Sequence, residues 1–140
     1  MNGLFYNNIL LVPVFTWIFS VILKGIYLKS INKFSISNSL GSGGMPSVHS
    51  ALVTSITTAI GVKYGVFGPN SDLFAASVVF SMIIIYDAIN VRFEAGLHAK
   101  TLNELTGKQY NFNESIGHLP KEAFVGSLIG IFSAYILMMI

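Results

Sequence analysis

Four long apolar stretches constrain the fold of this chain more than any other feature of its sequence. They run from residues 4 to 23, 47 to 67, 73 to 91 and 123 to 140. A helix needs about 20 mainly apolar residues to cross a bilayer. Only 10% of the 140 residues are charged and 53% are apolar, whereas soluble domains carry about 25% charged residues. The sequence therefore predicts an all-α, polytopic membrane helix bundle of about four transmembrane helices, formed by residues 1–140 as a single domain.

The basic residues are distributed unevenly over these four expected spans. Seven of the eight lie at or in the first and third connections, and only Lys63 lies on the other side. Positive-inside bias then predicts a multi-pass cell-membrane protein with both connections in the cytoplasm and both termini outside. The mixed polarity of residues 92–105 predicts a helical extension of the third span or an interfacial helix. The net charge of +2, without a basic cluster, argues against nucleic acid as a partner.

A glycine-rich segment, GSGGMPSVHS, precedes the second apolar stretch. Pro46 suits the first turn of a helix, where the unpaired amides carry the positive end of the helix dipole. Gly43 and Gly44 let the backbone approach a ligand closely, and Ser47 adds a hydroxyl donor. Together these features predict a phosphate cradle with His49 one turn inside the helix. A flexible linker before an ordinary helix start is the alternative.

A second histidine stands in a similar position before the last apolar stretch. Pro120 suits the first turn of that helix, and Glu122 follows His118 by four residues. A carboxylate at this spacing can hold one imidazole nitrogen and raise the basicity of the other. The alternative is a glutamate that only stabilises a helix N-terminus. The small residues of GSLIG, from 126 to 130, favour close packing of this helix within or between protomers.

Three further polar residues lie at helical spacing near the end of the third stretch, namely Asp87, Glu94 and His98. Carboxylate and imidazole groups at this spacing can share a metal ion. Pairing of Asp87 or Glu94 with Arg92 or Lys100 is the preferred interpretation, so these residues are assigned a supporting or ion-pair role and no metal is expected.

Three blocks of the sequence resemble the signatures of a known family. GGMPSVHSA, YDAINVRFEAGLHAKTLNEL and GHLPKEAFVGSLIG are similar to blocks of the divergent type 2 phosphatidic acid phosphatase family, which is related to acid phosphatases and vanadium-dependent haloperoxidases. The resemblance runs from about Lys24 to the C-terminus. Residues 46 to 49 match the superfamily motif P-S-G-H, with Val48 in place of glycine. His118 and Glu122 match the end of a second motif, with glutamate for aspartate.

The chain also departs from the superfamily pattern at its basic residues. Phe112 stands where that second motif has an arginine, and only Lys24 can represent the lysine of a further motif. Arg92 is the candidate for the missing guanidinium. The phosphate-binding set that follows comprises Lys24, Arg92, Ser47, Gly43 and Gly44.

The resemblance implies a metal-independent phosphatase that acts on a lipid phosphomonoester or pyrophosphate at the bilayer surface. In that mechanism His118 attacks phosphorus, His49 serves as general acid and base, and Glu122 orients His118. No cofactor is expected, and vanadate or phosphate should bind the site. Because the basic residues are partly replaced, a non-catalytic protein that binds lipid headgroups on a degenerate phosphatase scaffold is the alternative.

Overall fold

The structure is a computed structural model that describes residues 8–32, 34, 43–65, 71–107 and 109–140. These residues form helices and connecting segments without a β-strand among them. The helices are α1 (Asn8–Ser30), α3 (Val48–Tyr64), α4 (Ser71–Ile89), α5 (Val91–Leu105) and α6 (Pro120–Met139). The prediction of an all-α membrane helix bundle is therefore confirmed.

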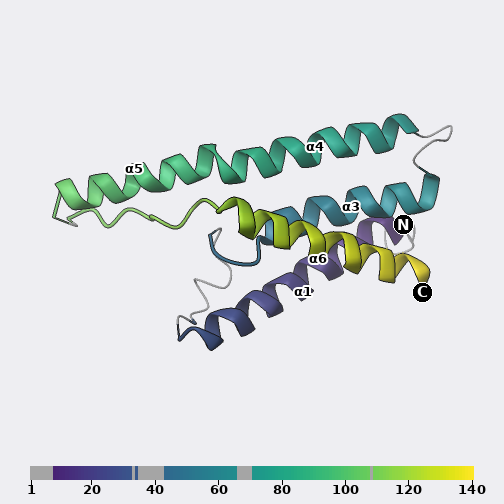
Figure 1. Cartoon of the computed structure of the whole chain (residues 1–140), viewed down its shortest axis with the longest axis horizontal. Helices are drawn as coiled ribbons and strands as arrows, with labels where there is room; N and C mark the ends of the chain where they lie inside the picture. Colours follow the sequence, from purple (N-terminus) through teal and green to yellow (C-terminus); the bar gives the residue numbers. More distant parts are fainter. Residues whose placement is uncertain (1–7, 33, 35–42, 66–70, 108) are drawn as a thin grey trace, which may run out of the picture.

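Helix α3 lies at the centre of the bundle and packs against α1, α4 and α6 (Figure 1). Helices α4 and α5 form one long rod, because the hydrogen-bond ladder continues across Asn90. Its N–H donates to the carbonyl of Tyr86 at 3.0 Å, and its own carbonyl accepts from the N–H of Glu94 at 2.9 Å. The expected extension of the third span is thus helical. Residues 109–119, the return segment, run back beside α5 toward the start of α6 (Figure 1).

The bundle places small and polar side chains inside and large apolar side chains outside. Thr16, Ser20 and Ser55 are fully buried, whereas Phe80 and Phe132 are more than 60% exposed. Such a distribution would be unfavourable in water, but lipid tails solvate large apolar groups as well as a protein interior does. Small residues inside also let the helices approach closely. The packing is therefore that of a protein built for a bilayer.

Three helical segments within the described residues are long and apolar enough to cross a membrane. They are Ile9–Ser30, Ser71–Leu105 and Pro120–Met139. They correspond to the first, third and fourth expected spans, but each has shifted bounds, and residues 4–7 lie outside the described part of the chain. The second expected span, 47–67, forms the 17-residue helix α3, about 25 Å long; residues 66 and 67 are not described, and its crossing of the bilayer stays a prediction.

Two glycines of α6 allow the closest helix contact in the bundle. A Cβ added to Gly126 would stand 2.2 Å from the carbonyl oxygen of Ser47, and one added to Gly130 would stand 2.3 Å from that of Ala51. Across the same contact, the hydroxyl of Thr54 donates to the carbonyl of Ser127 at 3.1 Å. The small-residue face of 126–130 therefore packs within the chain, against α3. This contact fixes the start of α6 beside the start of α3.

Candidate functional site

His118 lies directly before α6 and is held there at both its backbone and its ring. Its N–H donates to the carbonyl of Ala88 at 3.0 Å. Its Nδ1 lies 3.3 Å from Oε2 of Glu122, which also accepts the N–H of Leu119 at 3.0 Å. The side chain is only 2% exposed, and Nε2 has no hydrogen-bond partner among the described residues. With Nδ1–H donated to the carboxylate, Nε2 carries an available lone pair.

His49, on the first turn of α3, faces this ring. The centroids of the two imidazoles are 6.4 Å apart, with their planes inclined by 58°. A hydrogen bond to an oxygen spans about 2.7–3.2 Å, so both rings can reach the same small anion. The two rings differ in environment because His49 is exposed and His118 is buried. The two histidines that the sequence singled out are thus brought together.

Lys24 lies inside α1, not at the end of a span, since the helix continues for six more residues. The side chain is only 1% exposed. A Cβ added to Gly44 would stand 3.7 Å from its Cε, which places the lysine beside the glycine-rich segment. Its charge interacts with that of Glu122 and with both imidazoles. A cation is therefore buried next to the two histidines.

The start of α3 differs from the expectation in one respect. The N-cap is Ser47 and the helix begins at Val48, so the prediction that Pro46 occupies the first turn is wrong. The hydroxyl of Ser47 accepts the N–H of Ser50 at 3.3 Å and lies 2.9 Å from the hydroxyl of Ser50. The N–H of Ser47 donates to the carbonyl of Glu122 at 3.1 Å. In this arrangement Ser47 caps the helix and ties it to α6; its contact with an anion stays a prediction.

Arg92 and Asp87 form an ion pair at the junction of α4 and α5, with Arg92 Nε 2.5 Å from Asp87 Oδ2. The preferred pairing of Asp87 with Arg92 is therefore confirmed. The charges of both residues act on His49, so the pair lies near that ring. The arginine side chain is 44% exposed.

Glu94 and His98 lie exposed along α5. No group of three or more His, Asp, Glu or Cys side chains is close enough to hold a metal ion within the part of the chain that the structure describes. The alternative of a metal site built on Asp87, Glu94 and His98 is therefore not supported. Phe112, which stands where the superfamily motif has an arginine, lies on the return segment and is 43% exposed.

The return segment is held by residues that sequence reasoning missed. Asn103, only 2% exposed, accepts the N–H of Phe112 at 2.7 Å and donates to its carbonyl at 2.8 Å and to Oε1 of Glu114 at 2.8 Å. A Cβ on Gly96 would stand 2.7 Å from the carbonyl of Glu114, and one on Gly117 only 2.3 Å from the backbone of Phe93. In the sequence, Asn103, Gly96 and Gly117 were marked only by lying within the blocks that resemble the family signatures.

Gly43 also packs against the return segment. A Cβ at this position would stand 2.5 Å from the carbonyl oxygen of Ser115, so the glycine permits a backbone contact. Gly43 and Gly44, together with Lys100 and Glu122, line a cavity of about 360 Å³ between the glycine-rich segment, α5 and the return segment. The predicted cradle residues Gly43 and Gly44 thus border a space that Glu122 lines but neither histidine does.

Burial lowers the pKa of His118 below its ordinary value, because the interior disfavours the charged imidazolium. The hydrogen bond and the charge of Glu122 act in the opposite direction, whereas the charges of Lys24 and His49 act with burial. The net effect keeps the ring neutral near pH 7. A neutral imidazole with one nitrogen held and the other free is the state that a nucleophile requires.

Fold and site together define an all-α membrane protein with a paired-histidine site at one end of its bundle. The chain belongs to the Divergent PAP2 family, which it matches over residues 5–133. It is also 36% identical over 115 residues to a protein of Bacillus subtilis (strain 168) named Uncharacterized membrane protein YuiD, an alignment that covers 69% of this chain and 71% of that protein. No solved structure matches the chain.

Proposed function

We propose that the protein is a membrane-embedded, metal-independent phosphatase that hydrolyses a lipid phosphomonoester or pyrophosphate through a phosphohistidine. The observation that carries this proposal is the state of His118: Nδ1 is held by Glu122, Nε2 is buried without a hydrogen-bond partner among the described residues, and the ring of His49 lies 6.4 Å away. Family membership supports a phosphatase scaffold.

In the proposed first step, the Nε2 lone pair of His118 attacks phosphorus and the bond from phosphorus to the leaving oxygen breaks. His49, protonated at that moment, gives its proton to the leaving oxygen. In the second step, neutral His49 takes a proton from water and the resulting hydroxide attacks phosphorus. The phosphorus–nitrogen bond then breaks, phosphate leaves, and His118 regains its lone pair. Glu122 holds Nδ1–H throughout and offsets the positive charge that develops on the ring.

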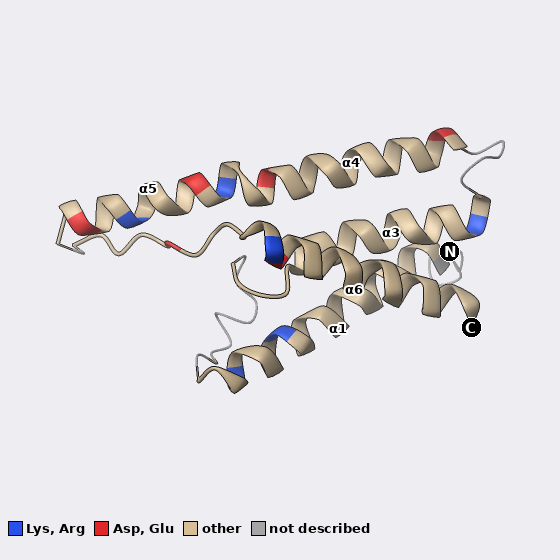
Figure 2. Cartoon of the chain, in the orientation of Figure 1, with Lys and Arg blue, Asp and Glu red and all other residues tan. Residues whose placement is uncertain are grey.

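Lys24 and Arg92 are the cations that we assign to the phosphate oxygens, because phosphoryl transfer depends mainly on positioning and electrostatic stabilisation. Figure 2 shows that the charged residues of α5, of the start of α6 and of the C-terminal half of α1 gather at one end of the bundle. The lengths of α4 and α6 carry no charge between their ends. This polarity suits a site at headgroup depth, and positive-inside bias favours the cytoplasmic side, in a multi-pass topology.

The test is phosphate release by purified protein from phosphatidate or a polyprenyl pyrophosphate in detergent micelles that contain a chelator. We expect turnover that vanadate inhibits, a phosphohistidine trapped by rapid quenching, and loss of both in His118→Ala. His98→Ala is the matched control, because this histidine lies exposed on the α4–α5 rod about 15 Å along it from Ala88, whose carbonyl accepts the N–H of His118. Turnover that persists in folded His118→Ala would exclude the phosphohistidine route.

A non-catalytic role in headgroup binding is the second candidate, and the position of Phe112 favours it. The superfamily arginine is replaced by an exposed aromatic residue whose backbone is tied to Asn103, and Arg92 is already paired with Asp87. Binding of phosphatidate vesicles that survives His118→Ala, without turnover by the unaltered protein, would establish this role instead.

A further inference from the structure

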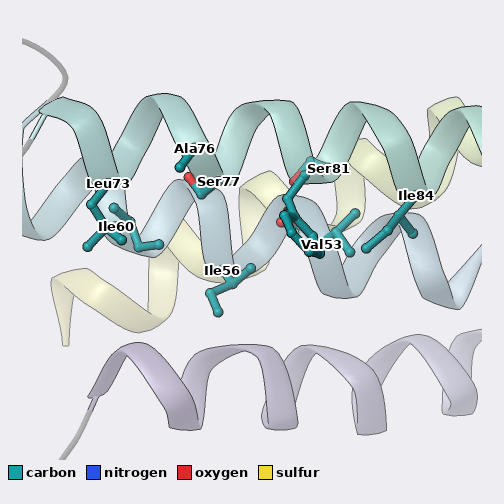
Figure 3. A pocket seen from close by; sticks show the side chains of 9 residues that line it. Val53, Ile56, Ile60, Leu73, Ala76, Ser77, Ser81 and Ile84 are labelled. Atoms are coloured by element: carbon teal, nitrogen blue, oxygen red, sulfur yellow. The ribbon is translucent and has the colours of Figure 1, made fainter.

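An apolar groove of about 280 Å³ runs between α3 and α4. Figure 3 shows the side chains of both helices that line it, among them Val53 and Ile60 from α3 and Leu73 and Ile84 from α4. Its rim is open to the outside of the bundle, since Leu73 is 50% exposed and Phe80, which also lines the groove, is 68% exposed. In a membrane this opening faces hydrocarbon.

The groove ends about one helical turn from residues of the paired-histidine site. Val53 follows His49 by one turn on the same face of α3, and Ile84 precedes Asp87 by one turn on α4. His49 also interacts electrostatically with Asp87 and Arg92. From this end the groove follows α3 for about 10 Å, to Ile60, and α4 for about 16 Å, to Leu73. A molecule with its phosphate at the histidines would extend into it.

The hydroxyls that line the groove are those of Ser77 and Ser81, and both are already hydrogen-bonded. Ser77 donates to the carbonyl of Phe74 at 2.7 Å, and Ser81 joins α4 to α3 beside Thr57. The hydroxyls of Thr57 and Ser81 lie 2.8 Å apart. Thr57 also donates to the carbonyl of Ser77 at 3.1 Å, and Ser81 to that of Val53 at 3.0 Å. An apolar molecule in the groove therefore leaves the hydroxyls of Thr57 and Ser81 with their hydrogen bonds intact. A polar molecule would find few unused hydrogen-bonding groups there.

We propose that this groove, the chain groove, holds the first part of a hydrocarbon chain of the substrate whose phosphate lies between His49 and His118. The inference rests on the proposed function and assigns the acyl or prenyl chain of its lipid substrate to one place in the bundle. The geometry favours the substrate's own chain because the groove begins one helical turn from His49 on α3 and from Asp87 on α4, and because it opens to lipid. Soluble phosphomonoesters lack the part of the molecule that this groove binds.

The first test narrows the groove at Ala76, which lines it about 12 Å from Ile84 along α4. In Ala76→Phe we expect kcat/KM for dipalmitoyl phosphatidate to fall about tenfold relative to that for dihexanoyl phosphatidate, the loss produced when about two methylene groups are denied burial. Short chains end before this position. Ala75→Phe is the matched control, because Ala75 is exposed and does not line the groove; it should leave the ratio unchanged.

A binding measurement separates this inference from the proposed function. Phosphatidate with a mid-chain diazirine should crosslink to α3 and α4 in the unaltered protein and in Ala75→Phe, and much less in Ala76→Phe. Crosslinks that map only to the second apolar groove, between α1 and α6, or an unchanged chain-length ratio in folded Ala76→Phe, would overturn the inference. If the crosslinks appear as expected but no lipid phosphate is hydrolysed, the chain groove stands and the phosphatase proposal fails.

Discussion

Replacing Glu122 by glutamine tests the electrostatic part of the proposed mechanism. Glutamine keeps the length of the side chain and an oxygen that can accept the N–H of Leu119, so the start of α6 should remain folded. It removes the negative charge, which lies 3.3 Å from Nδ1 of His118. At an effective dielectric constant of about 20, opposite unit charges at this distance attract by about 5 kcal/mol.

Only part of that attraction is expected to appear in the rate. Hydrogen bonds to charged groups contribute a net of about 1.5–3 kcal/mol, and each ~1.4 kcal/mol changes a rate tenfold. Because positive charge develops on the His118 ring during attack, we expect Glu122→Gln to lower kcat about 10- to 100-fold. The side chain of Glu122 is only 15% exposed, so solvent should screen the interaction little.

The assay is phosphate release from phosphatidate in mixed micelles, with thermal unfolding followed by circular dichroism on the same preparations. Glu104→Gln is the matched control, because Glu104 lies exposed on α5. It should change neither the rate nor the unfolding temperature. The reasoning is refuted if Glu122→Gln retains full kcat with unchanged stability, because the carboxylate would then contribute nothing to the charged ring.

Three further predictions concern packing, pH and the return segment. Gly126→Ala should lower the unfolding temperature in detergent, with a cost of about 1–3 kcal/mol, because the new Cβ would stand 2.2 Å from the Ser47 carbonyl; an unchanged temperature would contradict the α3–α6 contact. Since burial lowers the pKa of His118, the folded ring binds protons less readily than the unfolded one, so the free energy of unfolding should hold at pH 7 and fall as the pH drops below about 6.5; stability that instead falls as the pH rises through this range would show a raised pKa. Asn103→Ala should increase amide hydrogen exchange at residues 109–117, because the backbone of Phe112 loses both bonds to the side chain; unchanged protection there would mean that other contacts hold the segment.

Much of the fold follows from the sequence because helix formation and lipid solvation depend on local composition. Apolar runs of the length of a bilayer, with so few charges, have few structures open to them other than membrane helices. Pairs of polar residues near the ends of these runs can also be predicted from the sequence, because the partners are only a few residues apart. His118 and Glu122, four residues apart, lie close together across the start of α6. The pairing of Asp87 with Arg92 is also a short-range matter.

The composition of the site was decided by contacts between segments far apart in the chain. The approach of His49 to His118 depends on Gly126 and Gly130, which let α6 lie against the start of α3. No local pattern states which backbone a glycine will meet, so the contacts of Gly96 and Gly117 with their neighbours could not be foreseen.

Asn103 and Lys24 are polar residues whose burial could not be predicted from the local sequence. Asn103 reads as one polar residue among others on an amphipathic helix, yet the return segment that covers it makes it a buried clamp. Lys24 reads as the charged end of a span, but it lies buried inside α1, beside the glycine-rich segment. The sequence thus determined which residues carry the chemistry and that lipid surrounds them. Tertiary packing alone decided which of them share one site, because burial and proximity depend on what lies across the bundle.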